Sequence, residues 1–296
     1  MKAAPFDYVR ANHVQHALEL LSQWGGEAKL IAGGQSMVPM MAMRLARPVC
    51  LVDIDRIAEL KQFQLHSDHV TLGAGVRQST VEHSAELCKA LPLVAQALHW
   101  VGHQQTRNRG TVGGSLSYAD PSAELPLASL VLGANMQLES ASGGVRSVLA
   151  PDFFLGPMFT ALAEDECLTA IDWPIWQGAG IASSFEETAI RHGDFAMASA
   201  ACQLQVDDHG KFTRLSFGVG GVDGTPLVFS DLAVQMQGQT FNEETARELA
   251  HLAASRSQPG TDIHANADYR KHLAAVLLHR VLWKAYQSAC KSFRTH

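Results

Sequence analysis

Two glycine-rich stretches constrain most strongly what this chain can fold into. The first covers residues 30–37 (Leu-Ile-Ala-Gly-Gly-Gln-Ser-Met), and the second covers residues 109–115 (Arg-Gly-Thr-Val-Gly-Gly-Ser). In each stretch, adjacent glycines stand next to hydroxyl residues, and glycine permits backbone angles and close approaches that other residues do not. Successive N–H groups in such loops can form a concave anion site. Together, the two stretches could hold two phosphates, or one diphosphate from two sides.

The charge and cysteine content of the 296-residue chain exclude several classes of protein. A net charge of −6 offers no basic footprint for nucleic acid, and no apolar run is long enough for a membrane span. The start of the sequence lacks the apolar core of a signal peptide. The five cysteines lie far apart and form no Cys-x-x-Cys, which argues against a zinc site or an iron–sulfur cluster in this chain. We therefore expect a cytoplasmic protein with no metal ligands of its own.

The hydrophobic pattern predicts an α+β protein with two domains. We expect a first domain at residues 1–177, with lobes at about 1–57 and 58–177, and a second domain at residues 178–296. The boundary is placed at Gly178-Ala-Gly180, which has the composition of a linker. The second domain has strands first and helices after them, an order typical of an α+β unit.

Three helix starts are predicted from capping patterns. Asn12 is expected to cap a helix over residues 13–24, since asparagine is a preferred residue at that position. Ser79 and Glu82 have the spacing of a capping box, which predicts a second helix that reaches about Leu87. Asn242 is expected to cap a helix that reaches about Ser255.

Other motifs are weaker. Each glycine-rich stretch, taken alone, is more often a tight turn than a ligand loop. Neither has the Rossmann or the Walker spacing, and no Gly-x-Ser-x-Gly nucleophile elbow occurs. His99 and His103 are four residues apart, but no acidic third ligand stands near them. The run 191–196 (Arg-His-Gly-Asp-Phe-Ala) is, from spacing alone, first a strand-to-turn connection, although Asp194 and Phe195 could reach a ligand held by the first domain.

Taken together, the two stretches resemble the two FAD-diphosphate loops of a known family. That family comprises the FAD-binding medium subunits of molybdenum hydroxylases, of the aerobic carbon-monoxide dehydrogenase and xanthine dehydrogenase type. The resemblance includes residues 30–48, residues 107–126 and the run 191–196, and it covers essentially the whole chain. It implies a PCMH-type FAD-binding domain of two lobes, followed by a smaller domain of antiparallel sheet plus helices.

The resemblance also implies roles for individual residues. Residues 30–37 would wrap the FAD diphosphate, and the second stretch would close on it from the other side. Asp120 and Glu124 would accept hydrogen bonds from ribose or adenine. Val101 would pack near the cofactor, and Leu168 would line the isoalloxazine. No catalytic residue is expected in this chain. The implied FAD-binding residues are Leu30, Ile31, Ala32, Gly33, Gly34, Gln35, Ser36, Met37, Val101, Thr106, Gly110, Thr111, Gly113, Gly114, Ser115, Asp120, Glu124, Leu168, Asp194 and Phe195.

The function implied by the resemblance is electron transfer within a larger complex. A large subunit would carry molybdenum, a small subunit would carry [2Fe–2S] clusters, and the assembly would be a dimer of heterotrimers. Electrons would pass from the clusters through FAD to an external acceptor. Glu186 stands where some relatives carry a lysine near the flavin, which leaves the local charge open.

The sequence leaves several alternatives open. The substrate (carbon monoxide, a purine, an N-heteroaromatic or an aldehyde) and the electron acceptor do not follow from a shared fold. One rival function is a stand-alone PCMH-type flavoprotein oxidase, which often attaches FAD covalently through His or Cys. A second rival is a flavin-free scaffold subunit.

Overall fold

The first lobe is a small parallel sheet packed against one helix. The computed structural model describes residues 2–293. The strands run in the order β1-β3-β2, and α1 buries Ala17, Leu18 and Leu21 in the core of the lobe. The elements are β1 (Asp7–Arg10), α1 (Val14–Trp24), β2 (Ala28–Ile31), α2 (Met37–Ala42) and β3 (Cys50–Asp53), with 3₁₀ turns at Gly25–Glu27 and Glu59–Lys61.

The middle lobe is built on a five-stranded antiparallel sheet in the order β4-β5-β10-β6-β7. Its central strand, β10, buries Trp173 completely in the core of the lobe. The elements are β4 (Phe63–Leu65), β5 (His69–Gly73), α3 (Gln78–His83), α4 (Ala85–Ala90), α5 (Pro92–Trp100), α6 (Gln104–Arg109), α7 (Val112–Tyr118), α8 (Glu124–Leu132), β6 (Asn135–Ser140), β7 (Gly144–Leu149), α9 (Ala150–Phe153), β8 (Phe154–Gly156), β9 (Phe159–Thr160) and β10 (Glu166–Pro174).

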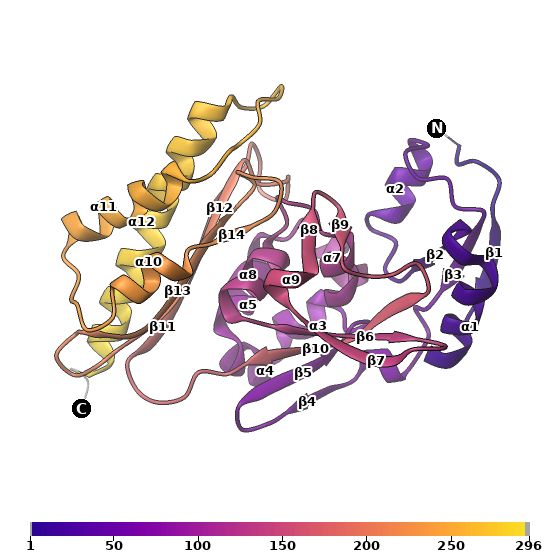
Figure 1. Cartoon of the computed structure of the whole chain (residues 1–296), viewed down its shortest axis with the longest axis horizontal. Helices are drawn as coiled ribbons and strands as arrows, with labels where there is room; N and C mark the ends of the chain where they lie inside the picture. The colour runs from indigo at the N-terminus through magenta and orange to yellow at the C-terminus, as the bar shows by residue number, and fades with distance from the viewer. Residues whose placement is uncertain (1, 294–296) are drawn as a thin grey trace.

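The C-terminal part is a four-stranded antiparallel sheet in the order β11-β12-β13-β14, with helices packed against it. Helix α12 covers one face and packs against α11, and α5 and α8 of the middle lobe lie against the other face (Figure 1). The elements are β11 (Ile181–Thr188), β12 (Ala198–Val206), β13 (Phe212–Gly220), β14 (Leu227–Val228), α10 (Ser230–Gln235), α11 (Glu243–Ser255) and α12 (Ala267–Ser292).

Helix α8 joins the two larger parts of the molecule. Every residue of α8 is buried, and the helix has apolar residues on all sides, as expected of a helix surrounded by protein. It contacts β12 and β13 of the C-terminal sheet as well as β10 of the middle sheet (Figure 1). The core of the middle lobe therefore continues into the C-terminal sheet, where Phe185 and Ala201 belong to it.

The predicted α+β class is confirmed, and so is the arrangement of a two-lobed FAD-domain fold followed by an antiparallel sheet with helices. The caps predicted at Asn12 and Ser79 are wrong. His13 caps α1, because its side chain accepts from the N–H of His16. Helix α3 starts at Gln78, whose N–H donates to the Gly110 carbonyl, so Ser79 lies inside the helix. Among residues 2–293, no helix has the length and hydropathy that a membrane span needs.

Candidate functional site

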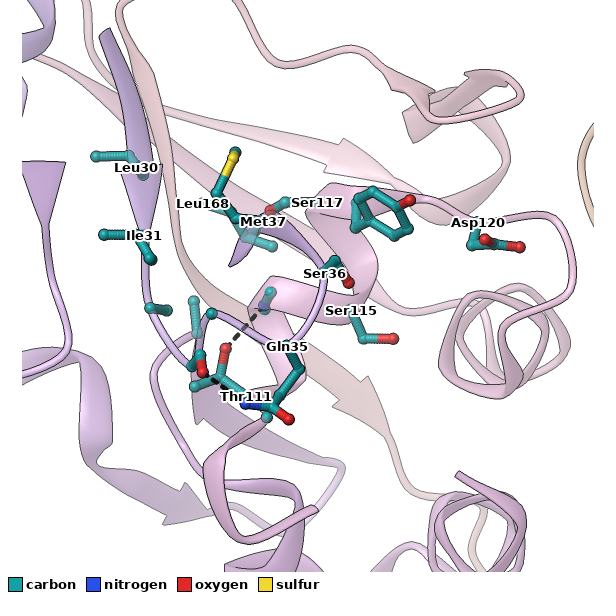
Figure 2. A pocket seen from close by; sticks show the side chains of 18 of the residues that line it. Leu30, Ile31, Gln35, Ser36, Met37, Thr111, Ser115, Ser117, Asp120 and Leu168 are labelled. Atoms are coloured by element: carbon teal, nitrogen blue, oxygen red, sulfur yellow. Dashed lines mark hydrogen bonds between the residues drawn. The ribbon is translucent and has the colours of Figure 1, made fainter. Parts of the chain in front are cut away.

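A cavity of about 690 Å³ is lined by residues from both lobes of the first domain and from the C-terminal part of the chain. Strand β2 and the first glycine-rich stretch form one wall, and α7 with the start of α8 forms another (Figure 2). All the residues that the sequence implied for FAD binding, from Leu30 to Phe195, line this cavity. The structure therefore brings together segments that are far apart in the sequence.

The two glycine-rich stretches touch each other. A Cβ atom on Gly33 would lie 2.0 Å from the carbonyl oxygen of Arg109, which is far too close. Only glycine, which has no Cβ atom, fits at this position. Gly34 adopts φ +71°, in the left-handed region that favours glycine. The side-chain amide of Gln35 donates to the Gly33 carbonyl at 3.0 Å and holds the turn closed. The two adjacent glycines therefore meet different requirements. Gly33 allows the close contact with the second stretch, and Gly34 allows the positive φ.

The first stretch carries hydrogen-bond donors that the protein does not use. The N–H groups of residues 33–37 donate to no other group within the part of the chain that the structure describes. Residues 33–37 line the cavity, and Figure 2 shows the Ser36 side chain there. Backbone donors grouped in this way form a concave site for an anion. This stretch therefore has the chemistry of a phosphate site.

The second stretch runs from the end of α6 into the first turn of α7, and most of its N–H groups are already used. Thr111 caps the helix by accepting from the N–H of Gly114 at 3.0 Å. The N–H of Gly113 donates to Ala74 at 2.9 Å, and that of Val112 donates to Val76 at 2.9 Å. The second stretch therefore offers an anion fewer free backbone donors than the first, and its predicted contact with the diphosphate stays a prediction. Its polar contribution comes from side chains such as Ser115, which Figure 2 shows among the cavity residues.

Acidic residues stand at the end of the cavity near α8. Glu124 is 7% exposed, and burial raises its pKa to about 7, with Asp120 adding to the rise and Arg107 opposing it. Burial also raises the pKa of Asp120, although its carboxylate accepts from the N–H of Ser122 at 2.9 Å. These carboxyl groups suit hydroxyl or amino groups of a ligand and do not suit its phosphates.

A buried arginine fixes the turn that carries Val101. The Arg107 guanidinium makes two bonds of 2.8 Å to the carboxylate of Glu82. It also donates to the carbonyl oxygens of Val101 at 2.9 Å and Gly102 at 3.1 Å. Val101 lines the cavity at the end of α5, and Thr106 and Gly110 line it from α6 and its end. Arg107 thereby positions Val101, one of the predicted site residues.

The C-terminal domain reaches the cavity through the loop between β11 and β12. Gly193 packs against His103, and Asp194 and Phe195 line the cavity, with Phe195 66% exposed. The run 191–196 is therefore both a strand-to-turn connection and part of the cavity wall. Glu186 is not among the lining residues, and its carboxylate pairs with Lys284 of α12 at 3.2 Å.

Some cavity residues were missed by sequence reasoning. Gln78 is 4% exposed, and its side-chain oxygen has no hydrogen-bond partner among the described residues. The β8–β9 hairpin adds Met158, Phe159 and Thr160 to the lining. Their positions depend on contacts between distant segments, and no local sequence pattern marks them. Gln78 stands immediately before the predicted capping box and is the first residue of α3.

Two family models match the chain. The model for the FAD binding domain in molybdopterin dehydrogenase matches residues 4–176. The model for the CO dehydrogenase flavoprotein C-terminal domain matches residues 183–285. The two matches together span almost the whole sequence.

Individual relatives are similar over nearly their full length. The 6-hydroxypseudooxynicotine dehydrogenase complex subunit alpha of Paenarthrobacter nicotinovorans is 34% identical over 290 residues, which cover 98% of this chain and 97% of that protein. The carbon monoxide dehydrogenase medium chain of Hydrogenophaga pseudoflava is 33% identical over 282 residues, which cover 95% of this chain and 97% of that protein. In the crystal structure of quinoline 2-oxidoreductase from Pseudomonas putida 86, one chain matches with a TM-score of 0.92 and 36% identity, covering 98% of this chain and all of that one.

Proposed function

Because this chain belongs to the family of FAD-binding medium subunits of molybdenum hydroxylases, we propose that it binds FAD in the cavity of about 690 Å³ and passes electrons through it. Cofactor pockets commonly have volumes of about 300–1,000 Å³. FAD supplies the redox chemistry when it is bound, and the protein binds and orients it.

The observation that carries the proposal is the row of unused N–H groups at residues 33–37. Backbone donors can hold the FAD diphosphate without a lysine, and neither glycine-rich stretch contains one. The hydroxyl groups of Ser36 and Ser115 would donate further hydrogen bonds to the phosphates. The close approach at Gly33 keeps these groups in place, because any side chain there would push the stretches apart.

The remaining roles follow from the chemistry of each part of the wall. Asp120 and Glu124 would accept hydrogen bonds from ribose or adenine, since carboxyl groups do not suit the phosphate end. Leu168, which is 4% exposed on β10, and Val101 would pack against the flavin ring. Asp194 and Phe195 would cover the ligand from the C-terminal domain, which we place at residues 178–296 after a first domain at 1–177.

The proposal assigns the other redox centres to partner chains. Relatives include a medium subunit of nicotine 6-hydroxylase and medium chains of carbon monoxide dehydrogenase, names that describe complexes of several subunits. We assign molybdenum to a large subunit and [2Fe–2S] clusters to a small one, in a dimer of heterotrimers. The five cysteines are all unpaired thiols, which supports a reducing cytoplasm. The substrate and the electron acceptor are not assigned.

The covalent oxidase is disfavoured by the cavity lining. Among the described residues that line the cavity there is no histidine, and the one cysteine is Cys167. Cys167 is 2% exposed, and burial raises the pKa of its thiol to about 12, so it does not supply a thiolate for attachment to flavin. We therefore propose non-covalent binding.

Ligand titration tests the role of the first stretch. The flavin-free chain is titrated with FAD, FMN and riboflavin, and flavin fluorescence reports the binding. We expect FAD to bind at least about a hundredfold more tightly than riboflavin, because only FAD offers a diphosphate and an adenosine. Equal affinity for riboflavin and FAD would contradict the diphosphate site.

A further inference from the structure

An arginine that does not line the cavity connects the second glycine-rich stretch to the first lobe. Arg77 stands immediately before α3 in the middle lobe. Its guanidinium donates to the carbonyl oxygen of Arg109, the first residue of the second stretch. The same guanidinium donates at 2.5 Å to the carboxylate of Asp55, which follows β3 of the first lobe. One side chain therefore spans the two lobes.

The carboxylate of Asp55 is fixed close to the first glycine-rich stretch. The residue before it, Ile54, donates its N–H to the carbonyl oxygen of Ile31 at 3.0 Å, and Ile31 belongs to that stretch. The N–H of Asp55 donates at 2.8 Å to the carboxylate of Asp53, which is 7% exposed and also accepts from the hydroxyl of Tyr8. Asp55 is therefore held at the edge of the first lobe from which the first stretch starts.

The backbone on both sides of Arg77 is bonded to the second stretch. The N–H of Gln78 donates to the carbonyl oxygen of Gly110 at 3.0 Å, and the N–H of Val112 donates to the carbonyl oxygen of Val76 at 2.9 Å. The guanidinium of Arg77 adds a bond to the carbonyl that precedes Gly110. The second stretch is thereby held by backbone bonds within the middle lobe and by one side chain that also reaches the first lobe.

That side chain acts where the two stretches come closest. The carbonyl oxygen of Arg109 is the atom that a Cβ on Gly33 would approach to 2.0 Å. The side chains of Arg77 and Asp55 are 23% and 31% exposed, so solvent screens their ion pair only in part. Hydrogen bonds between charged groups are stronger than those between neutral groups. Without Arg77, the Arg109 carbonyl would lose the partner that holds it against the first stretch.

We propose that Arg77, held by Asp55, is a positioning residue that sets the spacing of the two glycine-rich stretches and thereby favours a ligand with a diphosphate. The inference rests on the proposed function, because the diphosphate is that of FAD. Arg77 touches no ligand and acts through the Arg109 carbonyl. The binding of riboflavin, which has no phosphate, does not depend on this spacing.

The test compares FAD and riboflavin affinities of the full-length chain with those of Arg77→Gln and Asp55→Asn, by fluorescence titration. We expect FAD affinity to fall by about tenfold in each variant and riboflavin affinity to stay within about twofold. The double variant should bind FAD within about twofold of Arg77→Gln alone, because the two side chains act as one unit. Losses that simply add would contradict the role of Asp55.

The control is Arg256→Gln in the C-terminal domain. The Arg256 guanidinium makes two bonds of 2.8 Å to the carboxylate of Asp231, and neither residue lines the cavity. This variant should keep the affinities of the unmodified chain for both ligands. Unchanged FAD affinity in Arg77→Gln would overturn the proposal, and so would an equal loss of riboflavin and FAD affinity, which is the result of a merely structural role.

A second measurement needs no flavin. Hydrogen–deuterium exchange of the peptide that covers residues 109–115 is followed in the flavin-free chain. We expect faster exchange in Arg77→Gln than in the unmodified chain, and no change in Arg256→Gln. Equal exchange in all three proteins would overturn the positioning role. If the unmodified chain binds no FAD, the proposed function fails, and the exchange rates still decide whether Arg77 holds the second stretch.

Discussion

At the scale of single residues, the first glycine-rich stretch owes its shape to two different demands. Gly34 needs a positive φ, and Gly33 needs the absence of a side chain where the Arg109 carbonyl comes close. The sequence predicted a loop in which glycine permits unusual backbone angles. The residues that it predicted for the site line the cavity. It could not show the contact with Arg109, because that contact joins segments that only the folded chain brings together.

Replacement of Gly33 with alanine should weaken FAD binding. The added Cβ would lie 2.0 Å from the Arg109 carbonyl oxygen, so the two stretches must separate, at a cost of about 1–3 kcal/mol. We expect flavin affinity measured by fluorescence titration to fall by about tenfold to a hundredfold. Gly260→Ala is the control, since no atom lies within 4 Å of the Cβ it would add. Equal affinities for the two variants would show that the close contact is not needed.

At the scale of helices and strands, a local signal predicted some elements, and long-range contacts decided the others. Asn242 caps α11 as expected, and the side chain of Thr245 bonds back to complete the box. Helix α7 was missed, because its two glycines are poor helix formers. The Thr111 cap and the acceptors on Ala74 and Val76 outweigh that preference. Such acceptors belong to other segments and leave no trace in the local sequence.

Replacement of Arg107 with lysine should destabilise the turn between α5 and α6. Lysine keeps the charge but loses the paired bonds to Glu82 and the bonds to two carbonyl groups. We expect urea unfolding to show a loss of about 2–3 kcal/mol, since the site is buried. We also expect about tenfold weaker FAD binding, because the turn carries Val101.

The control for this variant is an exposed ion pair. Arg247 pairs with Glu243 on α11 at 3.3 Å, and both side chains are more than half exposed. Arg247→Lys should therefore change the free energy of unfolding by less than about 0.5 kcal/mol. If Arg107→Lys has an effect as small as this, the buried arginine does not position the turn.

At the scale of the whole molecule, helix α8 belongs both to the hydrophobic core and to the wall of the cavity. Helix α8 fills the space between the middle sheet and the C-terminal sheet, and its first residue, Glu124, lines the cavity. The hydrophobic pattern predicted the α+β class, because the apolar face of each element is visible in the sequence. The pattern did not show that α8 packs against two sheets, or that Glu187 on β11 is buried.

Stability should fall as the pH rises. The pKa values of Glu124 and Glu187 are raised from 4.5 to about 7 and about 9, so the native state holds these protons more tightly than the unfolded chain. Their contribution to the free energy of unfolding is complete below about pH 4.5 and is lost as the pH rises through about 7 and then about 9. Urea unfolding at intervals between those limits measures the fall.

The matched variant for this profile is Glu187→Gln, which cannot gain a charge. Between about pH 7 and about pH 9 its stability should fall less steeply than that of the unmodified chain. An identical slope in the two proteins would mean that Glu187 does not hold a proton in the native state.

The central claim is that the cavity binds FAD without a covalent bond, and an absorption spectrum tests it most directly. The spectrum of the purified chain is recorded with added FAD, and the chromophore is then released with acid and identified. We predict a flavin spectrum and full release of the chromophore as FAD. Flavin that stays with the denatured chain would contradict non-covalent binding. The absence of any bound flavin would contradict the account of the two glycine-rich stretches.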